Sequence, residues 1–135
     1  MSLDLTILFP SLGFRAIGES EAFCYERLRF DGDYSIFGQL VDMSDHYRRT
    51  EQDNDIPEKP TIKTIPIPPQ LWVETYGDEG IERTREDRYG TELTFVYAQQ
   101  LKKLSVRDDA STKNKAIKAF INALPDDMPV ILYWH

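Results

Sequence analysis

The sequence contains very little cysteine or histidine. Its 135 residues include one cysteine, Cys24, and two histidines, His46 and His135. A single cysteine excludes an intramolecular disulfide and a zinc site built on cysteine pairs. Because Phe23 and Tyr25 flank Cys24, we expect it to be a buried structural thiol.

Long hydrophobic runs are also absent. A helix that spans a bilayer needs at least about 18 consecutive apolar residues, and no run in this chain approaches that length. The apolar stretch Leu3–Phe9 is too short for a signal peptide, and the charge within it is the acidic Asp4. We therefore expect a cytoplasmic protein with no membrane partner.

Motifs that bind nucleotides or activate a nucleophile are missing as well. The 7 glycines are scattered, and none forms GxGxxG, GxxxxGK[ST] or GxSxG. Neither histidine has the ligand spacing of a metal site. The sequence therefore predicts no cofactor, no metal and no catalytic residue. The alternative is a small hydrolase or nucleotide-processing enzyme in which His46 is a general base beside acidic residues of 78–92.

Acidic residues outnumber basic ones and give a net charge of −7. This balance argues against nucleic acid as a partner, because phosphate binding requires basic surface. It suits solubility and a basic partner. Between 78 and 88 the acids alternate with Arg83, Arg85 and Arg88, a pattern typical of a solvated loop or ribbon with surface ion pairs rather than a cation site.

The C-terminal segment Pro129–His135 is apolar, β-branched and aromatic, and it follows a helix-stop signal at Leu124-Pro125. It predicts a buried strand. Alternating apolar residues within 4–30 predict the strands that pair with it, with a bulge or bend near Glu26. A helix at 19–28 is the competing interpretation of part of that region.

These patterns together predict a single α+β domain over residues 1–135. We expect a mostly antiparallel sheet from 4–30 and the terminal strand, with three helices packed on one face. The helices are expected at 33–42, 92–105 and 111–124, where apolar residues recur at intervals of three and four. A helix that leads directly into the last strand also permits a βαβ-like C-terminal unit.

Residues 44–66 are polar and then proline-rich, and we expect them to form a long exposed loop. After this loop, Pro68-Pro69 is predicted to open a short helix with Leu71 on its apolar side. Exposed aromatic, basic and proline-flanked apolar residues are the best candidates for contact with a partner. These candidates are Tyr47, Arg48, Arg49, Ile67, Trp72 and Tyr76.

Several segments resemble, in the same order, an uncharacterised family of small phage and prophage proteins. They are DYSIFGQL at 33–40, IPPQL at 67–71, the Leu93-Thr94 pair and the VILYW run at 130–134. Where that family often has Asp-Gly-His-Ser, this chain has EDRYGTE at 86–92 and no histidine. The resemblance therefore implies an association with phage or other mobile elements, and it implies no activity.

The function that these observations favour is a non-enzymatic one. We expect a small acidic protein of phage or mobile-element type that binds a protein partner through the polar-to-proline segment and the residues that follow it.

Overall fold

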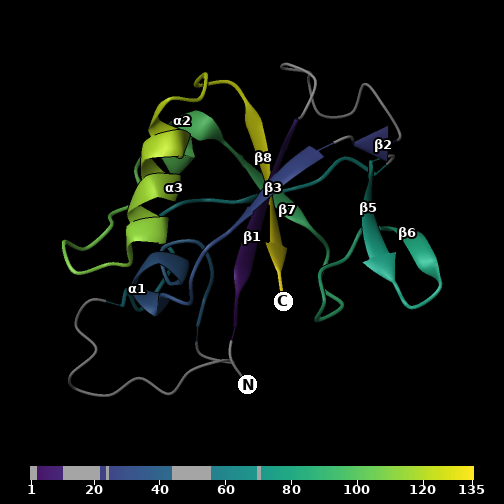
Figure 1. Cartoon of the computed structure of the whole chain (residues 1–135), viewed down its shortest axis with the longest axis horizontal. Helices are drawn as coiled ribbons and strands as arrows, with labels where there is room; N and C mark the ends of the chain where they lie inside the picture. Colours follow the sequence, from purple (N-terminus) through teal and green to yellow (C-terminus); the bar gives the residue numbers. More distant parts are fainter. Residues whose placement is uncertain (1–2, 11–21, 24, 44–55, 70) are drawn as a thin grey trace.

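The computed structural model describes residues 3–10, 22–23, 25–43, 56–69 and 71–135, and its largest element is a five-stranded sheet. The strand order is β3-β1-β8-β7-β4, and all neighbours are antiparallel. The strands are β1 (Leu5–Pro10), β3 (Tyr25–Arg29), β4 (Ile65–Pro66), β7 (Thr94–Tyr97) and β8 (Pro129–Trp134). The last strand, β8, therefore lies at the centre of the sheet, between β1 and β7 (Figure 1).

A smaller sheet lies beside the main one, on the side away from the helices (Figure 1). Its strand β2 (Ala22–Phe23) runs parallel to β5 (Trp72–Gly77), and β5 forms an antiparallel hairpin with β6 (Gly80–Thr84). Gly80 has φ of +111°, a conformation that glycine adopts at this turn without strain. The chain passes from the small sheet to the main sheet between β2 and β3. Within β3 the pairing with β1 is continuous from Tyr25 to Arg29, so the bulge or bend expected near Glu26 is not present.

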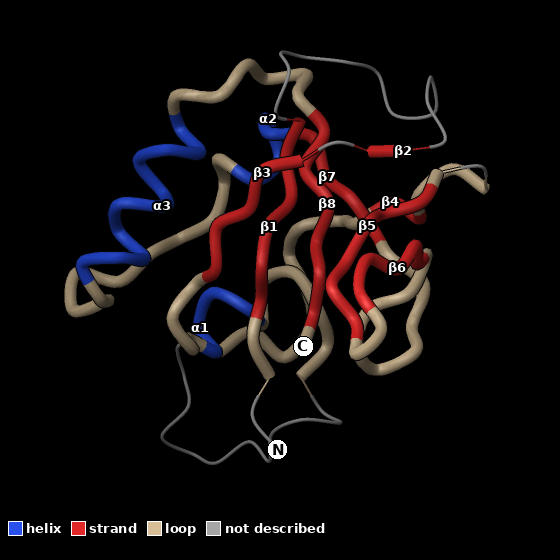
Figure 2. Tube along the Cα trace, turned by 45° about the vertical axis from the view of Figure 1, so that its right-hand side comes forward, coloured by secondary structure: helices blue, strands red, loops and turns tan. Residues whose placement is uncertain are grey.

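Three helices form a layer on one face of the main sheet: α1 (Tyr34–Phe37), α2 (Ala98–Leu101) and α3 (Thr112–Asn122) (Figures 1 and 2). The Asp33 side chain accepts a hydrogen bond from the Ser35 amide at the start of α1, and Ser111 accepts one from Asn114 at the start of α3. The predicted α+β fold with a mostly antiparallel sheet is confirmed. Within the described part of the chain, no helix has the length and apolarity to cross a membrane.

The apolar character of β8 arises because both of its faces are buried. Val130, Leu132 and Trp134 belong to the core beneath the helices. Ile131 belongs to a second core, which the sheet forms with the segment Ile67–Val73. A strand covered on both sides needs apolar residues at consecutive positions, and the run in the sequence meets that need.

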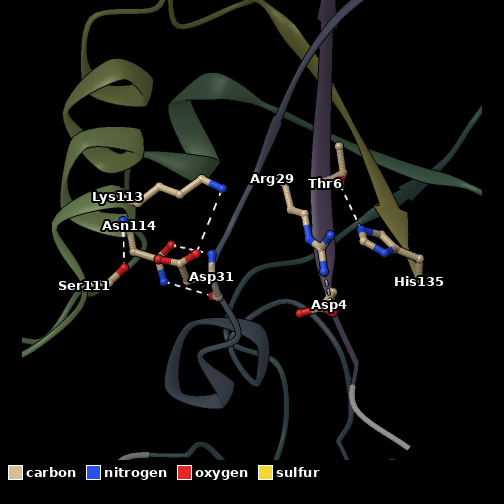
Figure 3. A network of polar contacts seen from close by, with 8 residues as sticks. All are labelled: Asp4, Thr6, Arg29, Asp31, Ser111, Lys113, Asn114 and His135. Atoms are coloured by element: carbon tan, nitrogen blue, oxygen red, sulfur yellow. Dashed lines mark hydrogen bonds and ion pairs between the residues drawn. The ribbon is translucent and has the colours of Figure 1, made fainter.

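Two buried side-chain amides connect the helix layer to distant loops. Asn114 accepts a hydrogen bond from the Asp31 amide (2.8 Å) and donates to the Asp31 carbonyl (3.0 Å) (Figure 3). Gln39 makes the same kind of pair with Ser105, at 2.9 Å in each direction, and also donates to the Ser35 carbonyl. Each side-chain amide therefore forms hydrogen bonds with both the backbone N–H and the backbone carbonyl of one remote residue.

The helix predicted at 92–105 is wrong for its first half. Residues Thr94–Tyr97 form β7, and the helical part is limited to Ala98–Leu101. Phe95 faces the second core and Val96 faces the helix core, so this strand is also apolar on consecutive positions. A doubly buried strand that runs into a short helix thus mimics the spacing of a single long helix.

The helix predicted from Pro68-Pro69 is also wrong, because Trp72–Gly77 is the strand β5. Leu71 and Val73 are buried in the second core, and Trp72 between them is exposed. This alternation has the period of a strand, and pairing with β6 outweighs the helix-start signal of the prolines.

The other predicted elements have mixed outcomes. The helix at 111–124 is confirmed as α3. The charged segment after Gly77 forms the strand β6 of a ribbon. The helix α1 is shorter than the predicted 33–42. Tyr25–Arg29 is a strand, which rules out the competing helix there, and β8 has only antiparallel neighbours, which rules out a βαβ unit.

Part of the predicted loop at 44–66 lies outside the described residues, namely 44–55. In the remainder, Ile56 and Ile62 are buried, whereas Glu58 and Lys59 are exposed. The amide of Ile62 donates a hydrogen bond to the Gln39 carbonyl at 2.9 Å. This end of the segment is therefore attached to the helix layer before it enters β4.

Candidate functional site

The side chain of Arg85 organises the surface next to the small sheet. Arg85 follows β6, and one guanidinium nitrogen, Nη1, donates hydrogen bonds to the carbonyls of Pro68 (2.6 Å) and Leu71. The other, Nη2, lies 2.9 Å from Glu92 Oε1. The guanidinium has five donors in a fixed plane, so it can hold several backbone carbonyls at once. Arg85 thereby fixes the conformation of the segment that leads into β5.

Trp72 lies against this arginine and remains accessible. The Arg85 guanidinium carbon is 5.9 Å from the centre of the indole ring, within the range of a cation–π contact. Trp72 is 39% exposed, whereas its neighbours Leu71 and Val73 are buried. The indole thus presents a large aromatic surface that contacts the Arg85 guanidinium on one side.

A small pocket opens beside Glu92, the ion-pair partner of Arg85. Its volume is about 140 Å³, and its lining combines apolar residues with acids and hydroxyls. Leu3, Leu40 and Trp134 are buried and contribute the apolar part. The polar part consists of Asp87, Glu92, Thr64, Thr91 and Thr94, and Val41 and Tyr89 complete the lining. Arg85 therefore contacts both Trp72 and Glu92, which is one of the residues that line the pocket.

The acidic side of the pocket is carried by a well-ordered turn. Asp87 Oδ1 accepts hydrogen bonds from the amides of Tyr89 (2.8 Å) and Thr91 (3.1 Å). The Asp87 amide in turn donates to the Thr91 carbonyl at 2.8 Å, and Glu86 pairs with Glu92 as an isolated antiparallel bridge. Gly90 has φ of +80°, which glycine allows in such a turn. The turn positions the Asp87 carboxylate, and Arg85 positions that of Glu92.

Tyr133 is a half-buried residue of β8 that packs against the second core, and the Asp87 charge affects its phenol. Burial raises the pKa of the Tyr133 phenol, and the Asp87 carboxylate raises it further, whereas Arg88 opposes the rise.

A second polar group lies where β1 begins and the antiparallel β8 ends. His135 Nε2 is 2.8 Å from Thr6 Oγ1, and Arg29 forms an ion pair with Asp4 at 3.0 Å (Figure 3). A base within reach of a hydroxyl is one requirement for nucleophilic catalysis. Thr6, however, is only 9% exposed, near the start of β1. The contact therefore serves to join the chain after β8 to β1.

We expect this histidine to make stability depend on pH. Burial lowers the pKa of His135, Arg29 and Arg88 lower it further, and Asp4 opposes them. Between the folded pKa and the unfolded value of about 6.5, the unfolded chain binds more protons, so the free energy of unfolding falls as the pH falls through this window. Denaturant titrations between about pH 7.5 and pH 5 should show this fall in the wild type and a smaller one in His135→Gln.

His46→Gln is the matched control, because it removes the other histidine and leaves His135 in place. The fall should persist in this variant. Equal pH profiles for the wild type and His135→Gln would contradict the assignment to His135.

The structure places the residues singled out by the sequence in different settings. Trp72 is exposed beside Arg85, whereas Ile67 is only 2% exposed and packs in the second core. Tyr76 lies in β5. The remaining candidates, Tyr47, Arg48 and Arg49, lie outside the described residues, as do His46 and Cys24.

Sequence reasoning assigned Arg85 and the neighbouring acids to surface ion pairs, and it did not predict the hydrogen bonds of Arg85 to backbone carbonyls or the pocket beside Glu92. The partners of Arg85 are backbone carbonyls 14 to 18 positions earlier in the chain, and carbonyls leave no mark in a sequence. Asp87 carries a weak local signal, since an aspartate three residues before a glycine is compatible with a turn.

Among the described residues, no group of three or more histidine, cysteine or acidic side chains is placed to hold a metal ion. Comparisons of the chain with protein-family models, with curated proteins and with solved structures gave no significant match.

Proposed function

We propose that this chain is a non-enzymatic protein-binding domain of phage or mobile-element type that acts in the cytoplasm. Its contact surface is centred on Trp72. The observation that carries the proposal is an indole that is 39% exposed and lies over a fixed arginine.

Trp72 has the properties of a binding anchor. Tryptophan and arginine are enriched among the residues that dominate binding energy at protein interfaces. A side chain already fixed before binding loses little conformational entropy on association. Because Arg85 is anchored by the carbonyls of Pro68 and Leu71, it supports the indole in one orientation.

The charge of the chain and its sequence resemblance give the proposal further direction. A net charge of −7 favours association with a basic partner. The resemblance to small phage and prophage proteins supports a partner that such an element meets inside its host.

We expect Trp72→Ala to weaken partner binding strongly. Affinity capture from a lysate of the cells that encode the protein, followed by mass spectrometry, identifies proteins retained by the wild type. With a purified partner, Trp72→Ala should raise the Kd by about 30-fold, the effect typical of a central anchor residue. Titration calorimetry measures this change.

Phe120→Ala is the matched control, because Phe120 is 37% exposed but lies on α3, on the opposite side of the main sheet. This variant should bind like the wild type. Equal Kd values for Trp72→Ala and the wild type would refute a contact surface centred on Trp72.

A further inference from the structure

One edge of the main sheet is formed by β3, a strand with exposed charged residues (Figure 2). In the described sheet the strand order ends at β3, which pairs with β1 on its inner side. Glu26, Arg27 and Arg29 are exposed, and Leu28 is half-buried against the helix core. A strand at the edge of a sheet presents N–H and C=O groups that another strand can bind.

The register decides which backbone groups of β3 face outward. The Phe30 amide donates to the Leu5 carbonyl at 3.0 Å, which makes these two residues a hydrogen-bonded pair. Bonded and non-bonded pairs alternate along an antiparallel ladder, so Leu28 also bonds to β1. The N–H and C=O groups of Arg27 and Arg29 therefore point away from β1, toward the edge.

The next outward-facing residue, Asp31, shows how such groups are satisfied farther along the chain. The Asn114 side chain accepts a hydrogen bond from the Asp31 amide and donates one to its carbonyl, as a neighbouring strand would (Figure 3). Helix α3 thus closes the edge at Asp31. Within the part of the chain that the structure describes, the backbones of Arg27 and Arg29 have no comparable partner. The open part of the edge is therefore 26–29.

The side chain of Arg27 is accessible to a strand that binds at this edge. Arg27 is opposite Leu8 and lies on the side of the second core, whereas Leu28 lies on the helix side. Arg29, on the same side as Arg27, already pairs with Asp4 at 3.0 Å. The described residues provide no ion-pair or hydrogen-bond partner for the Arg27 guanidinium. An added strand can therefore place an acid opposite Arg27.

A second copy of the same edge is an unsuitable partner. In a two-fold antiparallel pair, each residue lies opposite one that faces the same side of the sheet. Centred on Glu26, Arg27 or Arg29, such a pair sets two copies of the same charged side chain opposite each other. Centred on Leu28, it sets Arg27 opposite Arg29. Like charges directly opposite each other are destabilising, so the edge selects against itself.

We propose that the outer edge of β3 binds an extended acidic segment of a protein partner as an additional antiparallel strand. The partner residue opposite Arg27 is an aspartate or glutamate, and the one opposite Leu28 is apolar. Main-chain hydrogen bonds supply the affinity in this mode, and alternate side chains supply the specificity. The edge belongs to the main sheet and Trp72 to the small sheet, so the proposal goes beyond the contact surface described above.

Capped hexapeptides added to the whole protein test the proposal. The peptide Thr-Glu-Val-Glu-Thr-Thr carries the expected alternation, and Thr-Lys-Val-Lys-Thr-Thr is its basic counterpart. In NMR titrations the acidic peptide should give saturable shifts of the Arg27 and Arg29 amides and slow their exchange with solvent. The basic peptide should give neither effect at the same concentration.

N-methylation of the peptide separates strand addition from simple charge attraction. The backbone of an acid opposite Arg27 exchanges both of its hydrogen bonds with that residue, whereas the intervening valine N–H points away from β3. Methylation of both glutamate nitrogens should therefore abolish binding. Methylation of the valine nitrogen should leave the affinity unchanged.

Arg27→Glu reverses the charge at the centre of the edge. This variant should bind the acidic peptide about tenfold more weakly, because a favourable cross-strand pair becomes a repulsive one. It should also bind the basic peptide more tightly than the wild type does. Lys63→Glu is the matched control, because it makes the same change of charge just before β4, at the opposite edge of the main sheet. The control should bind like the wild type.

Several results would overturn the proposal. They are no saturable binding of the acidic peptide, equal binding of the two peptides, equal weakening by Lys63→Glu, and tolerance of methylated glutamate nitrogens. A wild-type dimer in analytical ultracentrifugation that Arg27→Glu abolishes would identify a second copy as the occupant instead. Trp72→Ala should leave binding of the acidic peptide unchanged, so this inference and the proposed function fail separately.

Discussion

A chain that ends at Met128 should not fold. This truncation removes β8, which pairs with β1 from Leu5 to Leu8 on one side and with β7 from Thr94 to Tyr97 on the other. Without β8 the main sheet separates into a β3–β1 part and a β7–β4 part, with no strand pairing between them.

The energetic loss supports the same expectation. Val130, Ile131 and Leu132 are each 0% exposed, and full burial of such side chains contributes roughly 1.5 to 3 kcal/mol apiece. Trp134 adds an edge-to-face contact with Phe37, with ring centres 5.6 Å apart. The sum is comparable to the roughly 5 to 15 kcal/mol that stabilises a whole domain.

Circular dichroism and proton NMR of the truncated chain test this prediction. We expect loss of dispersed methyl and amide signals and no cooperative melting transition. His135→Ala in the full chain is the control, because it removes the contact with Thr6 and keeps every pairing of β8. A truncated chain that melts cooperatively at the wild-type temperature would show that β8 is dispensable.

The strand β8 also shows how far the sequence predicts this fold. A run of consecutive apolar residues at the C-terminal end correctly indicated burial and pairing with β1. The same double burial misled the interpretation of β7, because Phe95 and Val96 contribute to opposite cores and imitate helical spacing. Whether a short apolar run is a strand or a helix depends on which layers cover it, and those layers come from distant parts of the chain.

The candidate site was less accessible to prediction than the fold. Trp72 was singled out because it is aromatic and follows a proline-rich segment, and it is exposed. The features that define its surroundings are the hydrogen bonds of Arg85 to backbone carbonyls and the pocket beside Glu92. Both depend on tertiary placement, because neither backbone carbonyls nor empty volume is specified by a local pattern.

The Gln39→Glu substitution should cost about 3 to 5 kcal/mol at neutral pH, the penalty of an uncompensated buried charge. Gln39 is 7% exposed, and its Nε2 donates to the carbonyls of Ser35 and Ser105. A glutamate carboxylate would face both carbonyl oxygens and retain only the hydrogen bond from the Ser105 amide. The loop after α2 would then lose part of its attachment to the turn after α1.

The pH dependence separates this charge effect from simple loss of hydrogen bonds. Burial should raise the pKa of the introduced Glu above its unfolded value of about 4.3. Between about pH 4.3 and the raised folded pKa, the folded variant binds more protons than the unfolded chain. The stability of the variant therefore falls as the pH rises through the folded pKa. Urea titrations should therefore give a smaller deficit in the free energy of unfolding, relative to the wild type, at about pH 4.5 than at about pH 7.5.

The control Gln39→Met lacks the titrating group, and its deficit of about 1 to 3 kcal/mol should be the same at both pH values. A Gln39→Glu deficit that is also independent of pH would mean that the side chain moves to solvent, and that Gln39 does not fix the two loops as the contacts imply.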